Sequence, residues 1–284
     1  MAFSVERVAD IVDDGQDAAL DVALSKLDRI IRGYKSVITA FSGGVDSTFL
    51  AAKVAEILGP HYSLAVTANS PSLARSELEE CAALALELNL HWVSMATFEL
   101  TNPLYVQNGH DRCFHCKSEL MKTIAPMAKM RHATVVLGIN LDDLKEYRPG
   151  QDAAKQGGAK FPLVEAGFSK QMIRRASQSM GISVYDKPAT PCLSSRIPNG
   201  TPVTFNTLTK IARAESDLRK LGIANLRVRH YEDLARIEID APYMQLAFDQ
   251  RAQIVAAVKR AGYKYVTLDL EGFRSGSTAS LPDK

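Results

Sequence analysis

The stretch SGGVDS, residues 42–47, contains residue types that could bind a phosphate. Gly43 and Gly44 allow the backbone to turn sharply and approach a ligand closely, because neither carries a Cβ atom. The helix expected after them would direct its unpaired N–H groups and the positive end of its dipole at the ligand, which favours an anion. Asp46 would repel a bare phosphate, so a divalent cation, most naturally Mg²⁺, would bridge the two. The alternative is a tight turn in which Asp46 or Ser47 only caps the helix.

Three of the four cysteines are placed where they could do chemistry. Cys113 and Cys116 form a Cys-x-x-Cys pair at an expected helix start, and Cys192 lies in the loop TPCLSSRIP. Four cysteines are too few for a disulfide framework in a chain of this length, so we read them as metal, redox or nucleophile candidates. Three thiolates can hold a [4Fe-4S] cluster and leave one iron open for an extra, deliverable sulfide. Zinc is less favoured, because it needs a fourth ligand such as His115 or His110.

Two of the cysteines have other interpretations. Cys192 could be a direct nucleophile, with Arg196 and Lys117 lowering its pKa. Cys81 lies on a helical stripe with Leu78 and other apolar residues, which predicts buried packing and no chemical role.

Polar residues follow two further expected strands. Asn140, with Asp142 and Asp143, comes after the apolar run ATVVLG and could bind a nucleotide or a metal; a polar loop that caps a helix is the alternative. Ser70 is the predicted cap of the helix after the second strand, and we include it with Asn140 in a predicted nucleotide site.

Several arginines could bind the anionic parts of a substrate. Arg148 and Arg196 lie in loops and could grip a phosphate or carboxylate through two hydrogen bonds each. Arg227 and Arg229 alternate along a strand and so share one face, which suits a substrate phosphate; a solvated sheet face is the alternative. Glu238, on the neighbouring strand, would orient these two arginines.

The elements that position these residues follow a regular alternation over residues 1–203. Helices are predicted at 17–34, 47–59, 71–89, 112–130 and 170–181, and strands at 36–41, 62–67, 91–95, 133–138 and 182–185. Most of the strands are continuous apolar runs, as is typical of parallel strands buried on both faces. This pattern predicts an α/β fold with a doubly wound parallel sheet. In such a sheet the loops at 42–47 and 192 would face the same crevice.

A second, smaller domain is expected at residues 204–284. A Pro-, Ser-, Thr- and Gly-rich stretch precedes it, and the order then changes to helix, two adjacent strands, helix and strand. This order predicts a small α+β domain that serves substrate binding or oligomerisation.

Charge and hydropathy exclude several functional classes. The 34 Lys and Arg residues against 32 Asp and Glu leave a net charge of +2, too small for a broad nucleic-acid surface. No run approaches the ~20 apolar residues that span a bilayer, and the start has no signal-peptide pattern. We therefore expect a cytoplasmic protein without a membrane or nucleic-acid partner, and we expect it to form a homo-oligomer.

The glycine stretch resembles the SGGxDS motif of the PP-loop ATP pyrophosphatases, also described as adenine nucleotide alpha hydrolase-like proteins. The motif is matched by Ser42, Gly43, Gly44, Asp46 and Ser47. The resemblance implies that ATP is cleaved between its α and β phosphates and that AMP is transferred to a carboxylate or carbonyl oxygen.

Further stretches are similar to the LarE sulfur transferases of nickel-pincer cofactor synthesis, which support lactate racemase maturation. They are DRCFHCKSEL, GINLDDLKEYRPG, PCLSSRIPNGTPVT, LRVRHYEDLARIEI and LEGFRSGS, and the similarity runs from about Leu20 to Ser277. The resemblance implies adenylation of a carboxylate on a pyridinium dicarboxylate mononucleotide, followed by sulfur insertion to give a thiocarboxylate. Cys192 matches the sulfur-donor cysteine, which one form of the family sacrifices to dehydroalanine. Cys113 and Cys116 match instead the three-cysteine branch that binds a cluster, which argues against the sacrificial route for this chain.

Three other functions fit parts of the sequence. A tRNA thiolase can combine a PP-loop with three cluster cysteines, but it needs a basic surface for the phosphate backbone. An ammonia-using amidating ligase would leave the cysteines without a role. A nucleotide-binding sensor on the same fold would bind ATP and release no pyrophosphate.

Overall fold

The computed structural model describes residues 5–145 and 148–273, with side chains from residue 17 onward. Residues 146–147 and 274–277, which belong to two of the stretches quoted above, lie outside the described part. Contacts divide the chain into two compact units: residues 1–69, 75–97 and 117–190 form the first, and residues 70–74, 98–116 and 191–284 form the second. The predicted boundary lies between residues 203 and 204, whereas the chain passes into the second unit for the last time at Pro191. Within the described residues, no helix combines the length and apolar character needed to cross a bilayer.

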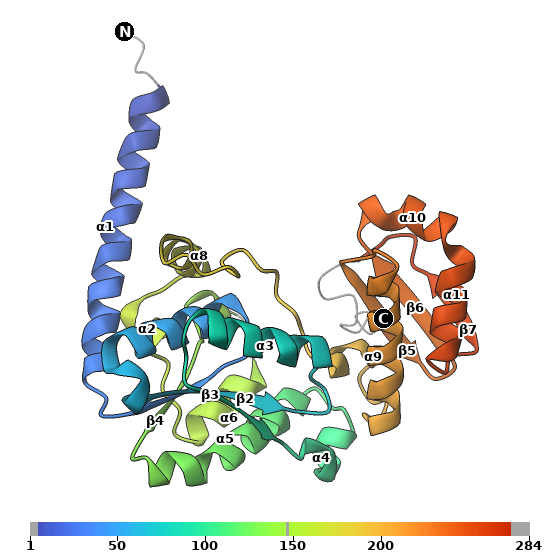
Figure 1. The fold of residues 1–284 in the computed structure, drawn as a ribbon, viewed down its shortest axis with the longest axis horizontal. Helices are drawn as coiled ribbons and strands as arrows, with labels where there is room; N and C mark the ends of the chain where they lie inside the picture. Colours follow the sequence, from blue (N-terminus) through green and yellow to red (C-terminus); the bar gives the residue numbers. More distant parts are fainter. Residues whose placement is uncertain (1–4, 146–147, 274–284) are drawn as a thin grey trace. The chain divides into compact units, whose positions relative to one another are not determined.

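The first unit is built on a parallel sheet of four strands in the order β3-β2-β1-β4 (Figure 1). The strands are β1 (Val37–Ala40), β2 (Ser63–Asn69), β3 (Trp92–Ala96) and β4 (Thr134–Leu137). β1 is central, and its first residue Val37 pairs with Ser63 on one side and Thr134 on the other. The chain adds β2 and β3 on one side of β1 and then crosses to place β4 on the other side. Between β1 and β4 the strand order therefore reverses.

Helices cover both faces of this sheet, as the apolar strands predicted. They are α1 (Val5–Arg32), α2 (Val45–Tyr62), α3 (Arg75–Glu87), α5 (Arg112–Met130), α6 (Pro149–Gln156), α7 (Pro162–Ala166) and α8 (Lys170–Ser179). Successive residues of β1 enter different cores. Val37 belongs to the core formed with α1, α2, α3, α7 and α8, while Ile38 belongs to the core formed with α5 and α6. Figure 1 shows α2 and α3 on one side of the strands and α5 and α6 on the other. The predicted doubly wound α/β fold is confirmed.

Two local predictions in the first 203 residues are wrong. The expected fifth strand at 182–185 is a turn, in which Ile182 and Val184 are buried against the first core. A short apolar run can be buried in either conformation, and Gly181, with φ of 70°, reverses the chain just before it. Ser70 does not cap a helix, because residues 71–73 form a turn and α3 begins only at Arg75.

The second unit contains the predicted small sheet, in the order β5-β6-β7. Its elements from residue 193 are the 3-10 helix η3 (Leu193–Arg196), α9 (Phe205–Lys220), β5 (Leu226–Tyr231), β6 (Leu234–Ile239), η4 (Ala241–Tyr243), α10 (Met244–Asp249), α11 (Arg251–Arg260) and β7 (Tyr265–Leu268). β5 and β6 are antiparallel, and β7 adds to β6 in parallel. The earlier segments η1 (Glu99–Thr101) and α4 (Pro103–Val106) also belong to this unit, and Tyr105 packs in one core with Leu193 and Leu208.

Candidate functional site

The glycine loop lies where an open α/β sheet binds ligands. It follows the carboxyl end of β1, at the point between β1 and β4 where the strand order reverses. Gly43 has φ of 71°, a conformation that favours glycine. The Ser47 hydroxyl accepts a hydrogen bond from the Ser42 amide at 3.1 Å and donates one to the Gly44 carbonyl at 3.0 Å. The loop is therefore closed on itself, with the N-terminus of α2 behind it.

Gly138 allows a second loop to approach the glycine loop. It follows β4, and a Cβ atom there would lie 2.8 Å from the Asp46 carbonyl carbon and from the Ser47 amide nitrogen. No larger residue fits without moving the start of α2. Gly138 was missed in the sequence analysis, although a glycine directly after an apolar strand is a signal for close backbone approach.

Asp46 lies at the centre of the polar groups on this edge of the sheet. Its Oδ1 accepts a hydrogen bond from Asn140 Nδ2 at 3.3 Å, and its Oδ2 lies 2.6 Å from Lys170 Nζ. The structure thus brings together two residues that the sequence placed in one site, Asp46 and Asn140. Lys170, the first residue of α8, was not among the predicted residues.

The loop after β4 contains the 3-10 helix η2 (Asp142–Lys145). Hydrogen bonds and ion pairs of its own side chains hold this loop in shape. Asn140 Oδ1 accepts hydrogen bonds from the backbone amides of Asp142 and Asp143 at 2.8 and 3.2 Å. Arg148 forms an ion pair with Asp143 at 2.7 Å. A hydrogen bond from Lys145, followed by one from the Lys170 amide, lowers the pKa of the Asp142 carboxyl. Both readings of this loop, ligand site and helix-capping loop, fit these contacts.

Ser70 has different partners from those predicted. Its hydroxyl forms hydrogen bonds with the Glu99 carboxylate and with Ser72 Oγ. Glu99 is buried, and it also accepts a hydrogen bond from Ser72. These residues belong to the second unit, and the role of Ser70 in ATP binding stays a prediction.

Cys192 is exposed on a loop whose backbone is fixed by buried groups. The Cys192 carbonyl accepts a hydrogen bond from Arg196 Nη1 at 3.1 Å, and the amide of the next residue, Leu193, donates to the Ser72 carbonyl at 2.8 Å. The Ser194 hydroxyl is 2.7 Å from the buried phenol of Tyr105. A reactive side chain on a rigid support keeps its geometry, so this loop can present a thiol in a defined position.

The other two candidate ligands, Cys113 and Cys116, lie within the first five residues of α5 and belong to the same unit as Cys192. Burial raises the pKa of the Tyr105 hydroxyl, and the charges of Cys192 and Cys116 raise it further, which places both thiols within electrostatic range of this phenol. Nevertheless, among the residues that the structure describes, no three His, Cys, Asp or Glu side chains are grouped as a metal site would require. Thiolates suit an iron–sulfur cluster chemically, but in this arrangement they are not gathered around one centre.

The two histidines considered as zinc ligands both have hydrogen-bond partners. His115 Nε2 is 3.0 Å from Asp111, and His110 Nδ1 is 3.2 Å from the Asn199 amide. Cys81, by contrast, behaves as predicted: it is fully buried, it lies against Gly43, and burial raises the pKa of its thiol to about 11.

Arg196 is buried and bonded to the protein itself. Its side chain forms an ion pair with Glu215, with Nε–Oε1 at 2.9 Å and Nη2–Oε2 at 3.2 Å. Its Nη1 donates to the carbonyls of Pro191 and Cys192 and to the Ser195 hydroxyl. With 1% of its surface exposed, this guanidinium supports the Cys192 loop, and the structure favours that role over the predicted grip on a substrate.

One face of the β5–β6 ribbon carries arginines, as the alternation predicted. Arg227 lies opposite Glu238 in the strand register, and Arg229 lies opposite Arg236. Glu238 is fully buried and bonds Arg229 at 2.8 Å, so it orients that residue as expected. It also bonds Arg236 at 2.8 Å.

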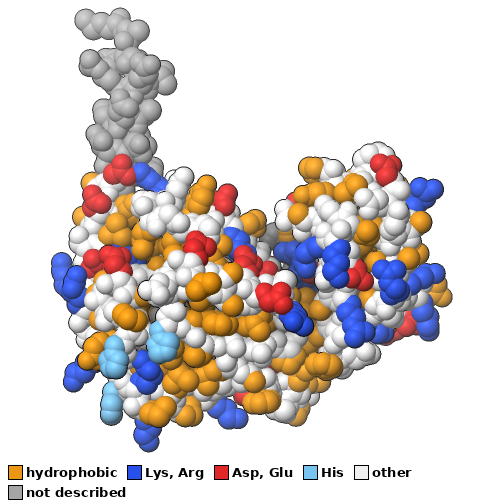
Figure 2. Space-filling view, viewed as in Figure 1, with side chains coloured by type: hydrophobic (Ala, Val, Ile, Leu, Met, Phe, Trp, Pro, Cys, Tyr) orange, Lys and Arg blue, Asp and Glu red, His pale blue; other side chains and the backbone are white. Residues whose placement is uncertain are grey.

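Arg227 differs from its neighbours because it is half-buried and bonds neutral groups. Its Nη1 donates to the Leu226 carbonyl, and its guanidinium stacks over the Phe273 ring at 4.8 Å. Burial, and then repulsion from Arg196, lowers the pKa of Arg227 to about 10. This electrostatic strain would be relieved by a bound anion. Figure 2 shows Lys and Arg side chains close together on the surface of the second unit.

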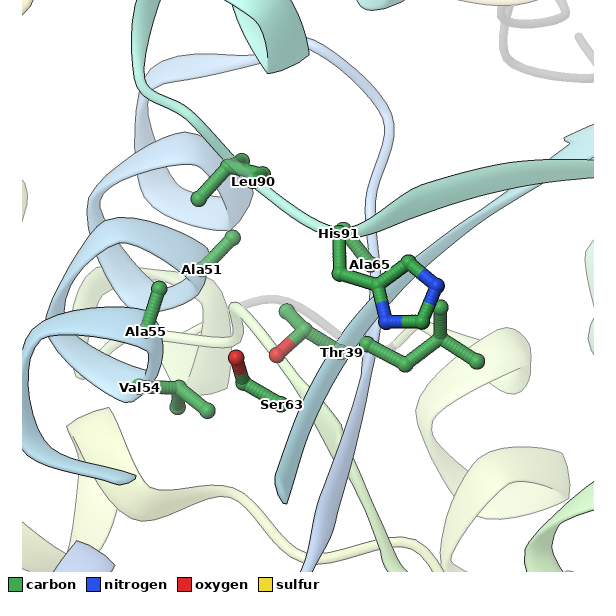
Figure 3. Close-up of a pocket in the computed structure, with 9 residues that line it drawn as sticks. Thr39, Ala51, Val54, Ala55, Ser63, Ala65, Leu90 and His91 are labelled. Carbon is green, nitrogen blue, oxygen red and sulfur yellow. The ribbon is translucent and has the colours of Figure 1, made fainter. Parts of the chain in front are cut away.

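A small cavity lies at the opposite end of the strands from the glycine loop. Figure 3 shows it between α2 and the strands β1 and β2, lined by apolar groups such as Ala51 and Val54 and flanked by His91. Its volume of about 10 Å³ has room for at most a single water molecule. This cavity is a packing defect in the core, and we assign it no ligand.

The fold and the loop therefore define a doubly wound α/β protein with a glycine turn at its switch point. No family model matches the chain. Among characterised proteins, the pyridinium-3,5-bisthiocarboxylic acid mononucleotide synthase of Lactiplantibacillus plantarum is 33% identical over 262 residues, which cover 91% of this chain and 94% of the synthase.

Two uncharacterised proteins are also similar. One, from Synechocystis, is 41% identical over 90% of this chain and 97% of its own length; the other, from Methanocaldococcus jannaschii, is 28% identical over 85% of this chain and 92% of its own length. The chain belongs to the family of the Lactiplantibacillus plantarum synthase, the LarE-type family.

Proposed function

We propose that this protein is an ATP-dependent sulfur transferase that converts a carboxylate of a pyridinium dicarboxylate mononucleotide into a thiocarboxylate. The observation that carries the proposal is the family relationship to a bisthiocarboxylic acid mononucleotide synthase, which extends over nearly the whole chain. The glycine loop with Asp46 supports the ATP-dependent half of the reaction, and the exposed thiol of Cys192 supports the sulfur-transfer half. The thiocarboxylate then enters nickel-pincer cofactor synthesis, which we place in the cytoplasm.

The first half-reaction activates the carboxylate. A carboxylate oxygen of the substrate attacks the α-phosphorus of ATP, pyrophosphate leaves, and an acyl adenylate forms. The backbone N–H groups at the start of α2 would donate hydrogen bonds to the polyphosphate, because helix N-termini attract anions. Asp46 would hold Mg²⁺, which supplies charge neutralisation between this carboxylate and the phosphates. The position of Lys170 supports this Mg²⁺ site, because its ammonium group shows that a cation can lie beside the Asp46 carboxylate.

The second half-reaction transfers sulfur. A sulfur nucleophile attacks the acyl carbon, the bond to AMP breaks, and AMP leaves with the electron pair. If Cys192 itself supplies the sulfur, its Cβ–Sγ bond must then break, with loss of the α-proton, to leave dehydroalanine. If Cys113, Cys116 and Cys192 hold a [4Fe-4S] cluster, that cluster would supply sulfide and leave the protein chain intact. We favour the cluster over zinc and over the sacrificial route, because the chain has three candidate thiols in one unit. The described structure does not gather these thiols around one centre, so cluster binding would require them to move together.

The arginine face of β5 and β6 is our candidate for the substrate phosphate. Arg227 is half-buried and bonds neutral groups, so it can bind an anion without breaking an ion pair to any residue that the structure describes. Arg229 would add a second charge that Glu238 holds in position. Arg148 is a further candidate. The homo-oligomer stays a prediction.

The proposal is tested by incubating purified, reduced protein anaerobically with ATP, Mg²⁺ and the pyridinium dicarboxylate mononucleotide. We expect pyrophosphate release that depends on the acceptor, and a product in which sulfur replaces oxygen. Asp46→Asn should fold normally and lose most of the Mg²⁺-dependent pyrophosphate release. Binding of ATP without pyrophosphate release in the presence of the acceptor would contradict the proposal and favour a nucleotide sensor.

A further inference from the structure

Lys170 makes the shortest described contact with Asp46, although its position in the sequence gave no reason to place it in the site. Its Nζ lies 2.6 Å from Asp46 Oδ2, while Asn140 occupies the other carboxylate oxygen. The two partners are 124 residues apart in the chain. The contact is accessible, because 35% of the Lys170 side chain and 20% of the Asp46 side chain are exposed.

The backbone of Lys170 is held in place while its side chain remains able to turn. Its amide donates a hydrogen bond to Asp142 Oδ2 at 2.8 Å, and Ser169 caps the start of α8 by accepting from the Met172 amide at 3.3 Å. Lysine carries its charge on a flexible four-carbon stem with three donors, so it can exchange one oxygen partner for another without movement of the backbone. The backbone of Lys170 is therefore fixed, while its ammonium group can move at the edge of the sheet where the glycine loop lies.

The charges of the site change when it is loaded. Without Mg²⁺ and nucleotide, the Asp46 carboxylate needs a cation, and Lys170 supplies it. When Mg²⁺ binds Asp46, the divalent ion repels the ammonium group and replaces it as the partner of the carboxylate. The polyphosphate brings several negative oxygens to the same place, and these are the nearest new partners for the released lysine.

We infer that Lys170 is a phosphate-binding residue of the ATP site that exchanges partners: it pairs with Asp46 in the empty site and with the polyphosphate once Mg²⁺ has taken Asp46. This inference rests on the proposed function, because it takes ATP as the ligand of the loop. It also explains why an aspartate next to a phosphate site is tolerated before the metal arrives. Binding of Mg²⁺ and of the polyphosphate should therefore be coupled through one side chain.

The test measures the affinity for inorganic pyrophosphate, in EDTA and in Mg²⁺, by calorimetry. In EDTA, Asp46→Asn should bind pyrophosphate about tenfold more tightly than wild type, because it removes a negative charge and frees Lys170. Adding Lys170→Met to Asp46→Asn should abolish this gain. In Mg²⁺, Lys170→Met alone should weaken pyrophosphate binding about tenfold, and Lys170→Arg should retain most of the affinity.

The matched control is Lys145→Met. Lys145 pairs with Asp142 at 2.7 Å in the same loop and is largely exposed, so its loss removes an equal charge nearby without touching Asp46. When Lys145→Met is added to Asp46→Asn, the double variant should keep the tighter pyrophosphate binding in EDTA.

The outcomes separate the inference from the proposed function. Two results would overturn the role of Lys170 and leave the ATP site standing. In the first, Asp46→Asn still binds pyrophosphate more tightly in EDTA after Lys170→Met is added. In the second, wild type binds pyrophosphate with Mg²⁺, but Asp46→Asn shows no tighter binding in EDTA. If wild type binds neither pyrophosphate nor ATP in Mg²⁺, the proposed function itself fails, and the inference fails with it.

Discussion

Cys192 and its surroundings show how a single exposed thiol is given a defined position. Buried groups hold the residues on either side: Arg196 bonds the Cys192 carbonyl, and Tyr105 bonds Ser194. The guanidinium of Arg196 is in turn held by the buried Glu215. Sequence reasoning identified the thiol and the arginine as functional candidates, but it assigned the arginine to the substrate or to lowering the pKa of Cys192, and not to supporting the loop.

The metal-ligand role of the cysteines can be tested by iron analysis. Anaerobically purified wild-type protein should carry iron and labile sulfide, and Cys113→Ala should lose most of both, because a cluster with two remaining thiolates is released easily. The matched control is Cys81→Ala, which removes a thiol that is buried in the core. Wild-type iron content and sulfur transfer in Cys113→Ala would rule out the cluster.

The origin of the transferred sulfur can be determined from the intact mass of the protein before and after one turnover. Transfer from a cluster should leave the chain mass unchanged. A loss of about 34 mass units located at Cys192 would instead show that the cysteine is converted to dehydroalanine. That result would refute the cluster as the sulfur source.

At the scale of elements, the site on the first unit depends on two loops that follow neighbouring strands. β1 and β4 are adjacent in the sheet although β2 and β3 separate them in the sequence. Their loops meet because Gly138 leaves room for the start of α2, and α8 then contributes Lys170. The order β3-β2-β1-β4 therefore determines which polar residues meet at this edge.

The close approach of these loops predicts the effect of Gly138→Ala. The added Cβ would lie 2.8 Å from two backbone atoms of α2, so we expect a loss of about 1–3 kcal/mol in the free energy of unfolding and weaker ATP binding. Gly181→Ala is the control, because Gly181 has a positive φ and no atoms within 4 Å of the added Cβ. It should lower the thermal midpoint without weakening ATP binding. Equal ATP affinity in both variants would show that the approach of the loops is not required.

The pairing of α9 with the η3 loop predicts a pH dependence of stability. Burial alone would raise the pKa of Glu215, but attraction to Arg196 and several hydrogen bonds outweigh it and lower the pKa. A carboxylate whose pKa is lowered in the folded state stabilises the fold fully at a pH above its pKa in the unfolded chain, about 4.3. This contribution is lost as the pH falls through the pKa in the folded state. Glu215→Gln should therefore lose about 3–5 kcal/mol at pH 7, since it leaves Arg196 buried without its carboxylate.

Denaturant unfolding at pH 7 and at pH 3 measures this effect. The difference between wild type and Glu215→Gln should narrow in acid, because below a pH of about 4.3 the unfolded wild-type chain binds a proton at Glu215 and the stabilisation from the ionised carboxylate decreases. Asp217→Asn, in the same helix and paired with Lys220 at the surface, should change the stability little at either pH. A difference that is equally large at both pH values would contradict the assignment of an ionised Glu215.

At the scale of the whole molecule, the two units have separate cores and carry different parts of the candidate machinery. The glycine loop, Asp46 and Lys170 belong to the first unit, while the three candidate cysteines and the arginine face belong to the second. The relationship to the synthase covers 91% of the chain and so includes residues of both units. Family membership is thus a property of the whole chain and does not rest on the glycine loop alone.

The overall charge predicts that nucleic acid is not the substrate. With a net charge of +2, the protein should bind tRNA weakly at physiological salt, and excess tRNA should neither compete with the mononucleotide nor accept sulfur. A tRNA thiolation assay with isotopically labelled sulfur checks this expectation. Salt-sensitive tRNA binding together with label in the tRNA would favour the thiolase alternative.

The sequence by itself determined the features that depend on local pattern. Continuous apolar strands predicted a parallel sheet covered on both faces, and the two glycines predicted the sharp turn after β1 that the structure shows. Only the tertiary structure decided that Lys170 lies beside Asp46, that Gly138 must lack a side chain and that Arg196 is buried. Each of these depends on contacts between segments far apart in the chain, and local periodicity carries no information about such contacts. For the same reason the short apolar run at 182–185 was predicted as a strand, whereas packing of the surrounding core makes it a buried turn.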